Sequence, residues 1–166
     1  MAIKDSLLPE FDHEMATTRR VLERVPDAEM DWRPHEKSMT LGQLAGHIAN
    51  MPAWCGITLE VDVLDLDTLG EDPRLKKPAS REAILKHFDD RRENARGLLA
   101  AQTDGAMMAR WSLKKGGHEI FTLPRVTALR SFVMNHMIHH RGQLTVYLRL
   151  KNVPVPPIYG PTADEA

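Results

Sequence analysis

Two histidines in the C-terminal half of the chain, His136 and His140, lie four residues apart in a segment whose apolar spacing predicts a helix. Residues at i and i+4 share one face of an α-helix, so the two imidazole rings can reach a common point. Neutral imidazole nitrogens are ligands for zinc, nickel, copper and iron. The spacing therefore predicts a pair of ligands for a divalent metal ion.

A third histidine, His47, lies in another predicted helix and shares its face with apolar residues. These neighbours are Leu44, Met51, Trp54, Cys55 and Thr58. If this face meets the C-terminal helix, three ring nitrogens converge. Three protein ligands leave one coordination position open for water or substrate, which is typical of a catalytic site rather than a structural one. The alternative is that each histidine is a hydrogen-bonded core residue without a metal.

The residues around the predicted ligands have more ordinary interpretations. Gln143 follows His140 by three residues and could bond its other ring nitrogen, or only line a polar patch. We place His139 beside the site or on the surface. Arg141 points away from the histidines, which favours a salt bridge or subunit contact over catalysis, and Cys55 fits a buried, inert thiol. The sequence identifies no catalytic acid or base.

Four predicted helices must position these side chains, which makes the fold class all-α, a four-helix bundle. They run from Asp5 or Ser6 to Val25, from Thr40 to about Val61, from Ser80 through Leu99, and from Pro124 to about Leu150. Thr40 and Gln43 have the spacing of a capping box, and Ser80 is a suitable N-cap. We expect Pro9 in a first turn, and Pro52 to kink or split the second helix.

The connections differ in length and composition. Residues 62–79 form a long acidic and then Gly- and Pro-rich stretch, which fits a bundle with a crossover. Residues 104–123, with Lys115-Gly116-Gly117 between two apolar stretches, predict a short β-hairpin between the third and fourth helices. The proline-rich tail after Leu150 is expected to lie extended over the bundle.

The last predicted helix has a second apolar face, which something must cover from solvent. A homodimer contact, the hairpin or the tail could cover it. It consists of Met134, Met137, Ile138, Thr145 and Leu148.

Composition indicates one compact domain over residues 1–166. The net charge of −1 gives no basic surplus for nucleic acid. The chain has one cysteine, an N-terminus unlike a signal peptide and no apolar run of the roughly 18 residues that a membrane span needs. We expect a cytoplasmic protein that binds neither nucleic acid nor membrane.

The segments SMTLGQLAGHIANMPAW and NHMIHHRGQLTVYLRLKNVPVPPIYG, together with the upstream DWRP, resemble the DinB family of damage-inducible, YfiT-like metalloproteins. The resemblance implies an up-down-down-up four-helix bundle. It also implies that His47, His136 and His140 form a triad for a divalent metal, nickel or zinc first, with iron or manganese as alternatives. It further implies a homodimer.

Two functions from different classes follow. The resemblance points to a metal-dependent enzyme that activates a thiol or water, of thiol S-transferase or hydrolase type, with a low-molecular-weight thiol and an electrophilic small molecule as partners. The alternative is a non-catalytic, stress-induced metal-binding protein. A metal-free helical binding module remains a third possibility, and it requires all three histidines to be structural.

Overall fold

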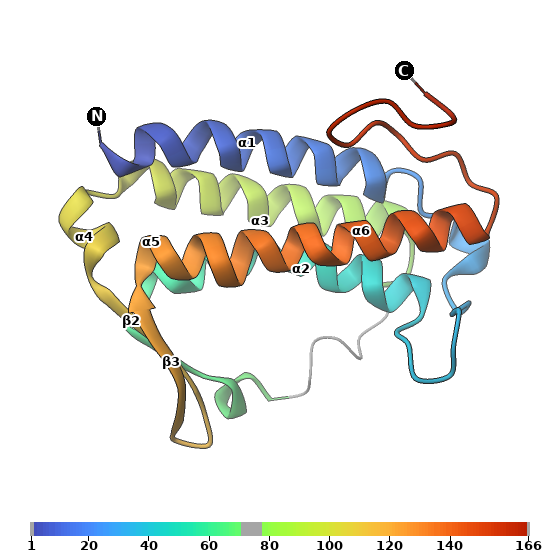
Figure 1. Ribbon diagram of the computed structural model, residues 1–166. Coiled ribbons are helices and arrows are strands. Elements are labelled where there is room, and N and C mark those ends of the chain that lie inside the picture. The colour runs from blue at the N-terminus through green and yellow to red at the C-terminus, as the bar shows by residue number, and fades with distance from the viewer. Residues whose placement is uncertain (1, 71–77, 166) are drawn as a thin grey trace.

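Four long helical segments form the bundle in this computed structural model, which describes residues 2–70 and 78–165. They are α1 (Ile3–Leu22), α2 (Leu41–Glu60), α3 (Arg81–Ala101) and a C-terminal segment made of α5 (Arg125–Ala128), the π-helical η4 (Leu129–Met134) and α6 (Asn135–Leu150). Figure 1 shows that α2 and α3 both run opposite to α1 and α6, the up-down-down-up order that the family resemblance implies.

The helix starts follow the capping residues of the sequence. Thr40 Oγ1 accepts a hydrogen bond from the Gln43 backbone N–H at 3.2 Å, and Gln43 Oε1 accepts one from the Thr40 N–H at 2.9 Å. Ser80 Oγ accepts from the Ala83 N–H at 3.1 Å. Both predicted caps are therefore confirmed, and each satisfies backbone donors that a helix start leaves without an internal partner.

The effects of two prolines and the end of one helix differ from the predictions. α2 continues through Pro52, so the predicted split of this helix is wrong. Pro52 is buried, and the packing around it outweighs the hydrogen bond that proline cannot donate. α1 starts at Ile3, which places Pro9 beyond the first turn, and ends at Leu22 because Val25 bonds the Leu22 carbonyl three residues back.

A small sheet extends from one end of the bundle. β2 (Arg110–Lys115) and β3 (His118–Pro124) are antiparallel, which confirms the predicted hairpin. The short α4 (Asp104–Met108) precedes β2. β1 (Val63–Asp65) pairs with β2 in parallel, so residues 62–79, predicted as a plain connection, contain a strand and the short η2 (Leu66–Leu69).

Asp65, at the end of β1, holds the hairpin turn. Its carboxylate accepts the Gly116 N–H at 2.9 Å and the Gly117 N–H at 2.7 Å, and both glycines have positive φ. These bonds, that of Gly117 foremost, lower the pKa of Asp65 because they favour the charged form. The turn chemistry therefore fixes where the hairpin points.

The second apolar face of α6 is covered by the chain itself. Met134, Met137 and Leu148 are buried in the core together with residues of α1. The tail lies over the bundle as predicted, and Val155 is buried. Ile138 and Thr145 of this face are half-buried, and the homodimer stays a prediction. No described helix is long and apolar enough to cross a membrane.

Candidate metal centre

Polar contacts at both ends fix α2 beside the C-terminal helical segment. At the end of α2, Arg125 Nε donates to the Thr58 carbonyl at 2.9 Å and Arg125 Nη2 to the Val61 carbonyl at 3.2 Å. At its start, the Tyr147 hydroxyl donates to the Met39 carbonyl at 3.3 Å. The facing sides of the two helices are therefore held in register between these two ends.

The three predicted histidines meet between these helices. His47 Nε2 lies 3.5 Å from His136 Nε2, which lies 2.8 Å from His140 Nε2. One ring nitrogen from each residue falls within 4.8 Å of the others. His47 is buried, whereas His136 and His140 are half-buried. The structure thus brings together every residue that the sequence singled out as a metal ligand.

The geometry of the nitrogens suits a divalent ion. With metal–nitrogen bonds of about 2.0–2.1 Å, the nitrogens of a tetrahedral site lie about 3.3 Å apart. The distances of 2.8 and 3.5 Å lie on either side of this value. A hydrogen bond joins only two ring nitrogens at a time, whereas a metal ion accepts the lone pairs of all three. The triad could therefore hold a metal ion.

A π-helical segment leads directly into α6, the helix that carries His136 and His140. η4 ends at Met134, and His136 follows in the first turn of α6. A π turn holds more residues than an α turn, so it changes the angular position of every later side chain relative to the residues before it. The π segment therefore helps to set the direction in which His136 and His140 face α2.

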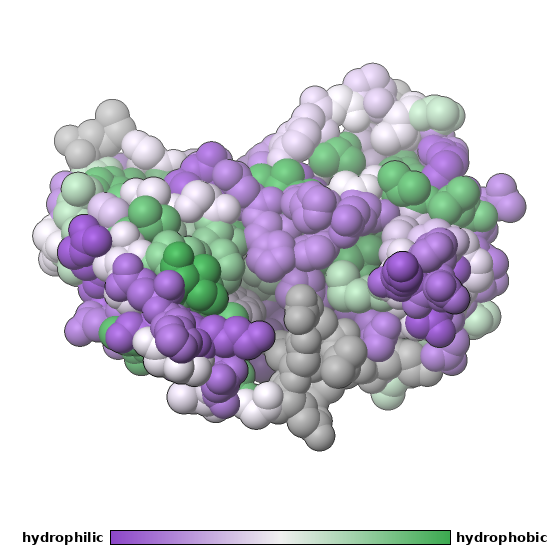
Figure 2. Space-filling view, turned by 60° about the horizontal axis from the view of Figure 1, so that its bottom comes forward, coloured by the Kyte–Doolittle hydropathy of each residue, from purple (hydrophilic) through white to green (hydrophobic). Residues whose placement is uncertain are grey.

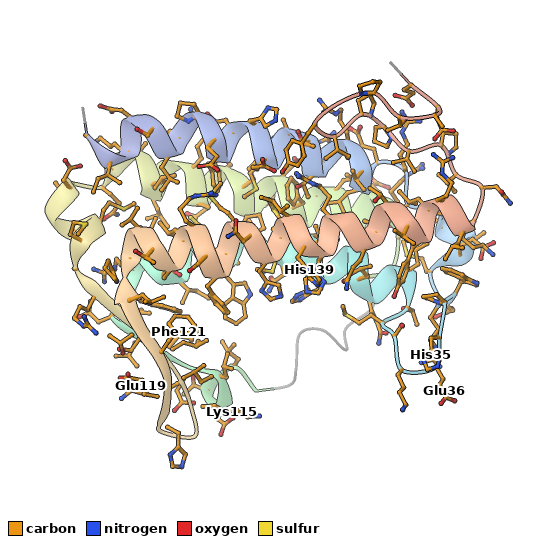
Figure 3. The ribbon with its side chains drawn as sticks, viewed as in Figure 1. His35, Glu36, Lys115, Glu119, Phe121 and His139 are labelled. Carbon is orange, nitrogen blue, oxygen red and sulfur yellow. The ribbon has the colours of Figure 1, made fainter. Side chains whose placement is uncertain are left out.

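Gln143 contacts His140 on the ring nitrogen that faces away from the other two histidines. Its Oε1 lies 2.7 Å from His140 Nδ1, which agrees with the first of the two alternatives that the sequence left open for Gln143. With the amide oxygen as acceptor, this contact fits the tautomer in which Nδ1 carries the hydrogen and Nε2 presents its lone pair to the other histidines. His139 is exposed, with its ring centroid 5.0 Å from that of His140. Figure 3 shows it between the hairpin, which carries Phe121, and the loop that carries His35.

The two remaining predictions for residues near the site also agree with the structure. Cys55 is buried, and burial raises the pKa of its thiol to about 12, so it stays protonated and unreactive at neutral pH. Arg141 is buried on the far side of α6 and forms an ion pair with Glu14 at 2.7 Å. The predicted salt bridge is therefore internal to the chain.

Sequence reasoning missed an aromatic cluster that adjoins the triad. The Phe132 ring centroid lies 5.9 Å from that of His136, 5.5 Å from Trp54 and 5.4 Å from Phe121 of the hairpin. Trp111 of β2 lies behind these rings, fully buried. Phe121 and Phe132 are only half-buried. The signal was the position of Phe132, one helical turn before His136.

Comparisons with known proteins agree with this fold. The model of a family described as the DinB family matches residues 1–166. YrdA of Bacillus subtilis (strain 168), described as an uncharacterized protein, is 28% identical over 163 residues, which covers 97% of this chain and 90% of that protein.

Two solved structures are similar over nearly their whole length. A DinB-like protein from Bacillus cereus ATCC 10987 has a TM-score of 0.75 at 22% identity, covering 95% of this chain and 98% of the other. The DinB-like protein YjoA of Bacillus subtilis has a TM-score of 0.71 at 17% identity, covering 93% and 98%. At these identities the two structures support the fold alone, and the evidence for the metal site comes from this chain's own residues.

Proposed function

Since this chain belongs to the DinB family, we propose that it is a metal-dependent enzyme that activates a thiol or a water molecule for attack on an electrophilic small molecule. The ion would be divalent, nickel or zinc first, held by His47, His136 and His140. The observation that carries the proposal is the convergence of three imidazole nitrogens within 4.8 Å, found in the part of the chain that the structure describes.

Three nitrogens rather than four favour catalysis over a purely structural role. Closed structural sites use four protein ligands, whereas sites with three keep a position for water or substrate. When bound, a divalent ion supplies Lewis acidity that lowers the pKa of a thiol or water at that position. His136 and His140 are half-buried, which supports access for a small molecule from one side of the triad.

The chain's own residues would bind the metal ion and orient its ligands. The three histidines serve as ligands and not as proton carriers, and Gln143 keeps His140 in the tautomer that binds a metal. In the thiol reaction, sulfur forms the new bond to the electrophilic carbon, and the leaving group departs with the bonding electrons. The thiol proton goes to solvent. Cys55 is not the thiol, because it is buried and protonated.

Elemental analysis of protein expressed without a histidine tag tests the metal. We expect about one ion per chain in the parent protein and none in a His136→Ala, His140→Ala double variant. The matched control is His139→Ala, which removes an exposed neighbouring imidazole outside the triad and should retain the ion. A parent protein that takes up no zinc, nickel, iron or manganese on reloading would overturn the proposal.

Activity is tested next with the ion that binds. The loaded parent should transfer thiols to electrophiles, or hydrolyse activated esters, and the double variant should do neither. A loaded protein with no activity on a broad panel, and with no exchangeable solvent on the ion, would identify the non-catalytic metal-binding protein instead. Paramagnetic relaxation of water protons by the nickel-loaded protein measures that exchange.

A further inference from the structure

The surroundings of the triad differ on its two sides. Toward the hairpin lie the half-buried rings of Phe132 and Phe121, whereas along α6 in the other direction lie the exposed polar side chains of His139 and Gln143. Figure 2 shows this face of the molecule, with apolar surface on the hairpin side of a polar central area. A molecule bound at the triad therefore meets an apolar and a polar wall.

The aromatic wall is fixed in place from behind. Trp54 of α2 and the buried Trp111 of β2 both contact Phe132, with ring centroids 5.5 and 6.2 Å away. Phe121 stands edge-on to Phe132, at an interplanar angle of 66°. Rings in such a cluster cannot turn without disturbing their neighbours, so the exposed parts of the half-buried Phe121 and Phe132 form a preformed surface.

The register of β3 against β2 places Phe121, but not its neighbour Ile120, in this wall. Phe121 pairs in register with the buried Leu113 of β2, so both side chains lie on the sheet face toward the bundle. Ile120 has no partner in β2, because the register shifts between Leu113 and Lys114, and it is 52% exposed. The hairpin therefore presents one aromatic ring toward the bundle and leaves the neighbouring aliphatic side chain largely in solvent.

We propose that the molecule that reacts at the triad carries a flat apolar group, such as an aromatic ring, which packs against Phe132 and Phe121. Its reactive end lies at the open metal position, and its polar atoms lie toward Gln143 and His139. This assignment of a substrate class rests on the proposed function. A continuous path of ring contacts from Phe121 through Phe132 to His136 supports it, because it joins the apolar wall directly to a ligand.

Binding to the cobalt-loaded full chain tests this assignment without relying on turnover. Acetohydroxamate and benzohydroxamate offer the metal the same chelating group and differ in a methyl against a phenyl group. Changes in cobalt absorption report the binding of each. We expect benzohydroxamate to bind about tenfold more tightly, the upper range of an added aromatic contact. In Phe121→Ala that preference should fall to about twofold, whereas Ile120→Ala should retain it.

Acetohydroxamate binding distinguishes failure of the proposed function from failure of the aromatic subsite. It also reports whether a variant is folded. If neither hydroxamate changes the cobalt spectrum of the parent, the open position is absent and the proposed function fails. If both bind the parent equally well, or Phe121→Ala keeps the full preference while still binding acetohydroxamate, the aromatic subsite is overturned and the proposed function stands. Phe121→Leu, which keeps apolar volume without a flat ring, should show an intermediate preference.

Discussion

The two sides of α6 bury polar side chains in opposite ways. On one side, Arg141 is 1% exposed and is surrounded by acceptors: the Glu14 carboxylate at 2.7 Å, the Glu14 carbonyl, Thr18 Oγ1 and the Tyr159 hydroxyl. On the other side, His136 and His140 point their nitrogens toward each other and toward His47. The first cluster pairs donors with acceptors, whereas the second gathers groups of the same kind.

This difference separates a structural cluster from a candidate metal site. A buried guanidinium that meets a carboxylate and several oxygens has its charge and its donors satisfied by the chain itself. Three imidazoles that meet one another place their ring nitrogens around one point, a set that a divalent cation can bind. The Arg141 cluster is therefore complete in the folded chain, whereas the triad could take up a metal ion.

The largest expected effect comes from breaking the complete cluster. Arg141→Met leaves Glu14 buried without its counter-charge, which should lower the free energy of unfolding of metal-free protein by about 3–5 kcal/mol. Urea denaturation at neutral pH measures the loss. Removing both charges, in Glu14→Leu with Arg141→Met, should recover most of it, because an apolar pair of similar volume replaces the ion pair. A single variant as stable as the parent would show that the ion pair contributes little.

The main elements of the fold could be predicted because they rest on local rules. Capping residues marked the starts of α2 and α3, and Gly116 with Gly117 marked the turn of the hairpin. β1 was missed because three residues carry no recognisable periodicity, and its pairing with β2 is a contact between distant segments. η4 was missed because one π turn hardly alters the spacing of apolar side chains over six residues.

The site could be predicted in part for a similar reason. His136, His140 and Gln143 share one helix, so their spacing alone placed them together. His47 required knowledge of which helix faces which, and the family resemblance supplied it. The aromatic wall and the partner of Arg141 depend on packing between helices and hairpin. A buried glutamate such as Glu14, between Phe11 and Met15 in an apolar helix face, was the available signal for the ion pair.

A smaller effect is expected from replacing Gln143, which should change only the affinity for the metal ion. Gln143→Ala removes the acceptor that orients His140, and such contacts change metal affinity by about tenfold or more. Because Gln143 is exposed, the stability of metal-free protein should not change. Competition with a chromophoric chelator measures the affinity. Gln143→Glu keeps an acceptor at this position and should retain at least the parent affinity, whereas an unchanged affinity in Gln143→Ala would remove the orienting role.

The smallest expected effect comes from Tyr159, which joins the tail to the complete cluster. Its hydroxyl donates to Glu14 at 2.9 Å and accepts from Arg141 Nη2 at 2.6 Å. Tyr159→Phe keeps the ring and should lower the free energy of unfolding by about 1 kcal/mol, at the low end for bonds to charged groups because Tyr159 is 64% exposed. Metal content should stay at the parent level, since this side of α6 carries no ligand.

The pH dependence of that loss tests its cause. Burial first, and then the hydrogen bond to Glu14, raise the pKa of Tyr159, so the folded state favours the protonated hydroxyl. Its contribution should be fully present below the ordinary tyrosine pKa of about 10 and decline as the pH rises through the higher folded value. The stability difference between parent and Tyr159→Phe should therefore be constant from pH 6 to about pH 9 and shrink above it. A difference that does not change at high pH would show that ionisation of the Tyr159 hydroxyl is not coupled to folding.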